Sequence, residues 1–91
     1  MLTREQIVAA VHRAAADYPV KSVHLFGSYA DGTATEKSDV DFYVQFSQSP
    51  ISFFKVMGFR AMLEDMLGKD VDIVKQLPVD EADGMVCVYE A

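Results

Sequence analysis

The alternation of polar and apolar side chains from Ser38 to Phe46 restricts the fold of this chain more than any other feature. Such alternation is typical of a β-strand with one buried and one exposed face. One face carries Asp39, Asp41, Tyr43 and Gln45, and the other carries Val40, Phe42, Val44 and Phe46. Aspartate is a poor strand residue, and alternate residues lie only about 6.8 Å apart. The repulsion between the two carboxylates therefore needs an explanation: a solvated face, a cation such as Lys37, or a divalent metal ion.

Two longer helices flank this strand in the sequence. Thr3 and Gln6 have the spacing of a capping box, and the helix that they begin ends before Pro19. A second helix is expected over residues 51–67, with Ser49 as its N-cap, Pro50 at its first position and Gly68 as its stop. Its Phe and Met side chains are expected to cover the sheet and to be buried: Phe53, Phe54, Met57, Met62 and Met66.

Three more strands are predicted, over residues 21–26, 69–74 and 85–90. A helical turn and a loop should fill residues 29–37, and a short helical turn residues 78–84. The order of the elements predicts a single α+β domain over residues 1–91, with a mixed central sheet of about four strands and flanking helices.

Composition excludes several classes of protein. Hydrophobic residues make up 51% of the chain and charged residues 24%, which argues against disorder, and no apolar run reaches the roughly 20 residues of a membrane span. The net charge of −6 suits a divalent cation or a basic protein surface and disfavours long nucleic acid as the main partner. The N-terminal segment does not read as a secretory signal, and the lone Cys87 is expected to be a buried free thiol. Both features suggest the cytoplasm.

Gly27 and Ser28 follow the strand over residues 21–26, where it should turn into a short helix. At such a junction backbone N–H groups and a hydroxyl can hold phosphate oxygens. Asp72 lies in the apolar run 71–74, and if that strand neighbours the one carrying Asp39 and Asp41, three carboxylates share one face. Carboxylates beside a phosphate cradle suit Mg²⁺ and two-metal phosphoryl or nucleotidyl transfer.

Competing motifs are absent. The sequence has no P-loop, because no Gly-x-x-x-x-Gly-Lys occurs, and Asp39-x-Asp41 lacks the glycine and glutamate of an EF-hand. His12, His24 and Cys87 have no zinc-ligand spacing. His12 is expected on the exposed side of its helix and His24 as a packed strand residue.

The sequence also resembles a known family. Gly27-Ser28, ten further residues and then Asp39-Val40-Asp41 match the signature of the polymerase-β-like nucleotidyltransferases. The wording "GSYADGTAT", "SDVDFYV" and "LGKDVDIV" is most similar to the minimal nucleotidyltransferase (MNT) antitoxins. The resemblance covers about residues 21–74.

The resemblance implies a role for each matching residue. Gly27 and Ser28 would hold the β- and γ-phosphates of ATP, Asp39 and Asp41 would bridge two Mg²⁺ ions, and Asp72 would complete the site near the acceptor hydroxyl. MNT antitoxins are usually encoded with a HEPN-domain toxin, which they bind and, in studied systems, modify by transferring AMP to a tyrosine. Family members often carry a basic residue soon after Gly-Ser, whereas Asp31 stands here, and Lys37 is the candidate substitute.

Three functions follow as hypotheses. The first is a protein adenylyltransferase antitoxin, and the second is an antitoxin that neutralises its HEPN partner by binding alone. The third, a small-molecule nucleotidyltransferase resembling the aminoglycoside-modifying enzymes, ranks last because those enzymes usually carry an extra helical domain. Whether the chain forms a homo-oligomer or a hetero-oligomer is left open by the sequence, as are the acceptor and the preferred base.

Overall fold

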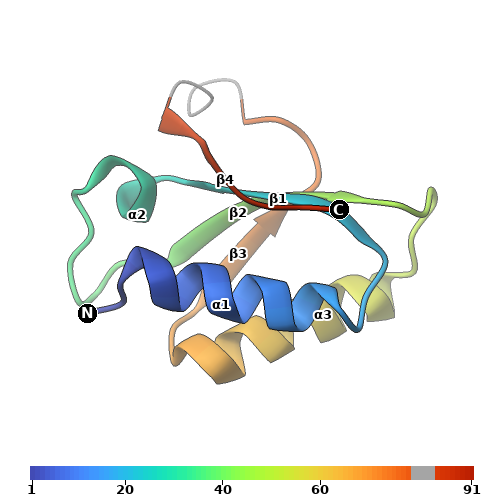
Figure 1. The fold of residues 1–91 in the computed structure, drawn as a ribbon, viewed down its shortest axis with the longest axis horizontal. Helices are drawn as coiled ribbons and strands as arrows, with labels where there is room; N and C mark the ends of the chain where they lie inside the picture. Colours follow the sequence, from blue (N-terminus) through green and yellow to red (C-terminus); the bar gives the residue numbers. More distant parts are fainter. Residues whose placement is uncertain (79–83) are drawn as a thin grey trace.

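The protein is described by a computed structural model that covers residues 1–78 and 84–91. The elements are α1 (Arg4–Ala15), β1 (Val20–Phe26), α2 (Ser28–Asp31), β2 (Val40–Phe46), α3 (Phe53–Leu67), β3 (Val71–Val74) and β4 (Val86–Glu90). The four strands form one mixed sheet in the order β3-β2-β1-β4. β1 runs antiparallel to β2 and β4, whereas β2 and β3 are parallel. Figure 1 shows α1 and α3 on the same side of this sheet and α2 beyond its end. The predicted mixed sheet with flanking helices is therefore confirmed.

The core lies between the sheet and the two longer helices. The capping box predicted at Thr3 is present: its hydroxyl accepts from the Gln6 N–H, and its own N–H donates to the Gln6 side chain at 2.8 Å. Apolar side chains at helical spacing in α1 and α3 meet the buried face of β2. These buried residues are Ile7, Val11, Ala14, Phe59, Leu63, Leu67, Val40, Phe42 and Val44. The alternation in β2 thus places Val40 and Phe42 in the core and Asp41 on the opposite, open face of the sheet.

The start of α3 differs from the prediction. Ser52, not Ser49, is the N-cap, and its hydroxyl accepts from the Phe54 N–H at 3.2 Å. The helix therefore begins at Phe53. Gly68 ends the helix as predicted, with a φ of 67°.

The expectation that the Phe and Met side chains of α3 are core residues is wrong for part of the helix. Phe53 and Phe54 are 70% and 84% exposed, and Met66 is also exposed. The buried stripe runs instead through Phe59, Leu63 and Leu67 at intervals of four residues. The first turn of α3 thus presents two adjacent aromatic rings to solvent.

The prediction of a buried Cys87 is also wrong, because its thiol is exposed. β4 places Val88 in the core, so its neighbour Cys87 lies on the open face, in register with His24 of β1. His12 is exposed as predicted, and His24 is half-buried. The predicted turn at 78–84 falls mostly on residues 79–83, which lie outside the described residues. Within residues 1–78 and 84–91, no helix is long and apolar enough to cross a membrane.

Candidate active site

Gly27 joins the end of β1 to the start of α2 in a conformation that favours glycine. Its φ is 75° and its ψ is −153°, a region of backbone conformation used almost only by glycine. Phe26, the residue before it, pairs with Asp41 of β2. A Cβ atom at Gly27 would collide with the Asp41 carboxylate. Glycine is therefore required here both by the backbone and by the close approach of Asp41.

Asp41 and Asp72 are direct neighbours across the parallel strands β2 and β3. The sequence left open whether the two strands adjoin, and they do; adjacent strands lie about 4.8 Å apart. Asp41 is half-buried and Asp72 is exposed. Their strand neighbours Val40, Phe42 and Val71 are buried in the core, so both aspartates lie on the opposite face of the sheet. Asp41 is also engaged in a further interaction within the chain. The Asp41 carboxylate thus has Gly27 on one side and Asp72 on the other.

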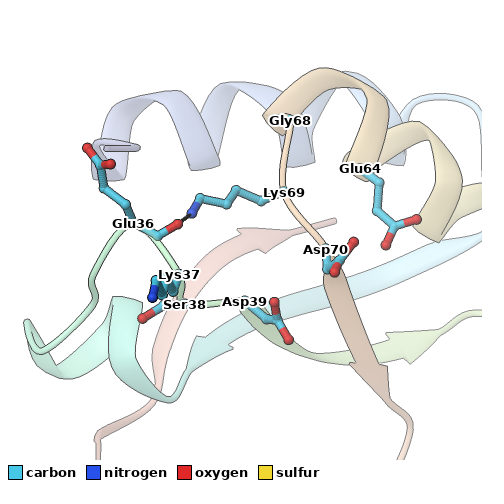
Figure 2. A pocket seen from close by; sticks show the side chains of 8 residues that line it. All are labelled: Glu36, Lys37, Ser38, Asp39, Glu64, Gly68, Lys69 and Asp70. Carbon is cyan, nitrogen blue, oxygen red and sulfur yellow. Dashed lines mark hydrogen bonds between the residues drawn. The ribbon is translucent and has the colours of Figure 1, made fainter.

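Asp39 precedes β2 and is exposed. The strand predicted from Ser38 begins at Val40, whose N–H donates to the Asp70 carbonyl at 3.0 Å and so starts the pairing with β3. A hollow of about 430 Å³ lies beside Asp39, and Figure 2 shows the side chains that line it. Four carboxylates and two lysines are among them: Glu36, Asp39, Glu64, Asp70, Lys37 and Lys69.

Two residues that the sequence analysis did not identify anchor this hollow. The Glu64 carboxylate accepts from the Val71 N–H at 3.0 Å and pairs with Arg60 at 3.5 Å, while the Arg60 side chain donates to the Val71 carbonyl at 2.7 Å. The i, i+4 spacing of Arg60 and Glu64 is the only trace of this arrangement in the sequence. The two side chains attach the last turns of α3 to the start of β3 and so help to fix the position of Asp72.

The two lysines behave differently. The Lys69 ammonium donates to the backbone carbonyl of Glu36, and Figure 2 shows its side chain extended between the two segments. Lys37, the predicted substitute for a missing basic residue, is exposed, and its backbone N–H donates to the Thr35 hydroxyl at 3.2 Å. Lys37 lines the same hollow as Asp39.

Mg²⁺ prefers carboxylate oxygens together with substrate phosphates as ligands. Asp41 and Asp72 fit as a pair, because they lie opposite each other beside a glycine that leaves room for the Asp41 carboxylate. Among residues 1–78 and 84–91, however, no three His, Cys, Asp or Glu side chains are grouped closely enough to hold a metal ion. The arrangement supplies two paired carboxylates, and the inclusion of Asp39 in the same site stays a prediction.

Ser28 is the first residue of α2, so its side chain lies at the N-terminus of this single helical turn. The Gly27 carbonyl accepts from the N–H groups of Ala30 and Asp31 at 3.0 and 3.1 Å, which closes the turn. The Ser28 carbonyl accepts from the N–H groups of Gly32 and Thr33, both at 3.1 Å. Gly27 and Ser28 thus occupy the strand-to-helix turn that the sequence predicted, and Gly27 lies directly against Asp41.

Asp31, the acidic departure from the family pattern, lies at the other end of α2. Its carboxylate accepts from the Thr33 hydroxyl at 2.6 Å and from the Thr33 N–H at 3.0 Å. These hydrogen bonds hold the pKa of Asp31 below its ordinary value. The charge of Asp31 is therefore used to organise the loop after α2, at the end of the turn away from Ser28.

Comparison with known proteins places this arrangement in context. The family model for the nucleotidyltransferase domain matches residues 7–89. A Methanocaldococcus jannaschii relative assigned as a protein adenylyltransferase is 46% identical over 57 residues, which is 63% of this chain and 57% of that protein. The protein adenylyltransferase MntA of Thermococcus cleftensis is 42% identical over 57 residues, again 63% of this chain and 57% of that protein. This chain thus spans less than two thirds of the length of these relatives.

Solved structures share the fold. One described as a minimal nucleotidyltransferase has a TM-score of 0.70 at 31% identity and covers 86% of this chain and 85% of that one. A chain from a toxin–antitoxin complex with AMP-PNP has a TM-score of 0.74 at 20% identity, covering 92% and 73% of the two chains. A chain from the complex of a tri-AMPylated Shewanella oneidensis HEPN toxin with its MNT antitoxin has a TM-score of 0.68 at 16% identity, covering 98% and 74%. The last two likenesses show the fold alone.

Proposed function

The chain belongs to the nucleotidyltransferase domain family, and from that membership we propose that it is an antitoxin that transfers AMP from ATP to a protein hydroxyl. The proposed acceptor is a tyrosine of a cognate HEPN-domain toxin. Relatives named protein adenylyltransferase and a similar fold in complex with an AMPylated HEPN toxin support the reaction and the partner.

The observation that carries the proposal is the position of Asp41 between Gly27 and Asp72. Gly27 and Ser28 would receive the β- and γ-phosphates, with Lys37 as the nearby cation. Asp72, on the far side of Asp41, would face the incoming hydroxyl. The three groups therefore follow one line across the sheet from β1 to β3, which is the order that an in-line displacement needs.

In the proposed reaction the acceptor oxygen bonds to the α-phosphorus as the bond from that phosphorus to the bridging oxygen of the β-phosphate breaks. Pyrophosphate leaves with that electron pair, and Asp72 would accept the proton of the hydroxyl. Asp41 and Asp72, with Asp39 as the predicted third ligand, would hold the two Mg²⁺ ions, which would activate the attacking oxygen and stabilise the leaving group. Asp41 would help to position the α-phosphate through the bound Mg²⁺.

The test is the transfer of label from α-³²P-ATP with Mg²⁺ to the cognate HEPN toxin. We expect wild-type protein to label the toxin and the Asp39→Asn/Asp41→Asn variant to label it at least about a hundredfold more slowly, because the charges that would hold Mg²⁺ are gone. Circular dichroism and thermal melting check that the variant keeps its fold. An unlabelled toxin with the wild-type protein would refute the transfer reaction.

A second candidate function is neutralisation of the toxin by binding alone. It is favoured by one observation: among the described residues, the carboxylates are not gathered into a set of three metal ligands. The same double variant discriminates between the two functions. If Asp39→Asn/Asp41→Asn still rescues growth of cells that express the toxin, binding is sufficient. If rescue is lost while the complex still forms, the transfer reaction is required.

We further propose that residues 1–91 act as one domain in the cytoplasm. One sheet and one hydrophobic core account for the described residues. The chain has a single cysteine, so it cannot form an internal disulfide, which suits a reducing compartment.

A further inference from the structure

A second hollow, of about 490 Å³, lies at the other end of β2. β3 pairs with β2 only as far as Tyr43 and Val74, whereas β2 continues to Phe46. The space beside the last residues of β2 is therefore left open by the shorter strand. Side chains from β2, from the connection to α3 and from the segment after β3 surround it. Those used in the argument are Tyr43, Gln45, Gln48, Lys75 and Gln76.

This hollow begins close to the candidate catalytic residues. Tyr43 and Gln45 follow Asp41 at alternate positions of the same strand, so all three lie on the open face of the sheet. The rise of a strand places Tyr43 about 6.7 Å and Gln45 about 13 Å from Asp41 along the strand. A nucleoside attached to a phosphate at Asp41 is long enough to reach the hollow.

The side chains of the hollow suit a purine base. The Tyr43 ring packs against His24 with ring centroids 5.7 Å apart and an angle of 33° between the planes, which supports its orientation. The Gln45 amide oxygen accepts from the Ser22 hydroxyl at 2.8 Å, and the Gln48 amide oxygen accepts from the Lys55 ammonium at 3.1 Å. With their oxygens used in this way, the two amides offer N–H donors, which match the ring nitrogens of a purine. Bases stack readily on aromatic rings.

Charge distinguishes this hollow from the one beside Asp39. The hollow beside Asp39 is lined by four carboxylates and two lysines, and ionised carboxylates only accept hydrogen bonds, so they do not match the acceptor nitrogens of a purine ring. None of the residues that line the second hollow is Asp or Glu, and Lys75 adds a positive charge. Each hollow lies at one end of β2, so a nucleoside that follows the strand in either direction enters one of them. The end without carboxylates is the favourable direction.

We propose that the hollow formed by Tyr43, Gln45, Gln48 and Lys75 is the subsite for the purine base and ribose of the nucleotide. This inference rests on the proposed function. In-line transfer uses the direction across the strands, with the leaving pyrophosphate toward Gly27 on β1 and the acceptor toward Asp72 on β3. The nucleoside then lies off this line, and a nucleoside that extends along β2 away from Asp39 reaches Tyr43.

The test compares two ligands by titration calorimetry, each with Mg²⁺: ATP, and inorganic tripolyphosphate, which has the phosphates but no nucleoside. We expect Tyr43→Ala to weaken ATP binding about tenfold, a loss typical of one base–aromatic stack, and to leave tripolyphosphate binding unchanged. Tyr43→Phe should keep ATP affinity within about twofold, because the ring remains. Phe54→Ala, which removes an exposed ring on α3, is the matched control and should change neither affinity.

Each outcome decides the proposal. Wild-type protein that binds tripolyphosphate as tightly as ATP has no base subsite, and a Tyr43→Ala variant that keeps full ATP affinity excludes this location. Equal weakening of both ligands would assign Tyr43 to the fold or to the phosphate site, and so would overturn the proposal. A wild-type protein that binds neither ligand refutes the subsite and the proposed function together. Normal Tyr43-dependent ATP binding without transfer to the toxin would refute only the reaction.

Discussion

Asp41 and Asp72 lie directly opposite each other on two parallel strands, and the structure thus places two carboxylates in adjacent positions of one sheet face. Like charges in such positions oppose folding, by up to about 1 kcal/mol. A cation bound between the two carboxylates would remove this repulsion, so it would stabilise the folded protein by a similar free energy. The pair therefore links the stability of the sheet to the occupancy of the proposed Mg²⁺ site.

Asp72→Asn is expected to stabilise the protein in metal-free buffer, because it removes one of the two opposed charges. Relief of a few tenths of a kcal/mol up to about 1 kcal/mol corresponds to a rise in Tm of about 1–8 °C for a domain of this size. Thermal melting in EDTA measures the change. Asp65→Asn, which neutralises an exposed carboxylate on α3, is the control for net charge. A Tm for Asp72→Asn at or below that of the control would show that the pair is not repulsive.

Gly27→Ala is expected to destabilise the protein more than Gly32→Ala. Both glycines have positive φ values, 75° and 85°. Gly32 is in the left-handed helical region, where alanine costs about 1–2 kcal/mol, whereas Gly27, with a ψ of −153°, is in a region used almost only by glycine. A Cβ at Gly32 meets nothing within 4 Å, whereas one at Gly27 collides with the Asp41 carboxylate. Gly27→Ala should therefore cost at least about 1 kcal/mol more in urea denaturation. It should also weaken binding of tripolyphosphate with Mg²⁺, and equal effects of the two substitutions would contradict the close approach.

Asp31 is expected to stabilise the fold at neutral pH but not in acid. The Thr33 hydroxyl and N–H hold the pKa of Asp31 below its ordinary value in the folded protein. The contribution is fully present above the pKa of the unfolded chain, about 3.9, and is lost as the pH falls through the lower folded value. The difference in Tm between wild type and Asp31→Ala should thus be constant from about pH 5 to 7 and shrink below about pH 4. In a Thr33→Ala background the difference in Tm that Asp31→Ala causes should depend less on pH, because part of the hydrogen bonding to Asp31 is gone. A difference between wild type and Asp31→Ala that grows in acid would contradict the prediction.

Phe59 and Phe54 are five residues apart on α3, and truncation to alanine is expected to lower the stability of the protein strongly at Phe59 and hardly at all at Phe54. Phe59 is fully buried, so Phe59→Ala should destabilise the protein by about 3–5 kcal/mol. Phe54 is 84% exposed, so Phe54→Ala should change the free energy of unfolding by no more than about 0.5 kcal/mol. Urea denaturation of the two variants provides the measurement. A large loss for Phe54→Ala would mean that its ring is covered in solution.

The sequence predicted the positions of Gly27 and Asp41 in the fold better than it predicted which apolar side chains are exposed. The spacing of Asp39 and Asp41 within an alternating strand was sufficient to place Asp41 on the open face, because alternation is a local property. The Gly27–Ser28 turn also follows from local signals. The pairing of Asp41 with Asp72 was expected only on condition that the two strands adjoin, since strand order depends on contacts that are distant in the sequence.

The wrong predictions concern burial and helix starts. Cys87 lies in an apolar run, but the sheet has no helix over its open face among the described residues, so an apolar neighbour of buried Val88 is exposed. Ser49 and Ser52 are equally good N-caps by residue type, and only the path of the chain out of β2 selects Ser52. Phe53 and Phe54 precede the buried stripe of Phe59, Leu63 and Leu67, and the first turn of α3 therefore leaves their rings exposed.

The interior position of β2 in the sheet restricts the motion of the backbone that carries Asp41. β2 pairs with a neighbour on each side, and its Val40 and Phe42 side chains are fully buried. Amide hydrogens of such a strand exchange only when much of the domain opens, so the backbone beneath Asp41 is held in place within the folded domain. In the proposed reaction, a slow step that governs nucleotide entry or product release would then arise in the connections around the sheet or in a bound partner. The strand that carries the central carboxylate would serve as the fixed reference against which those parts move.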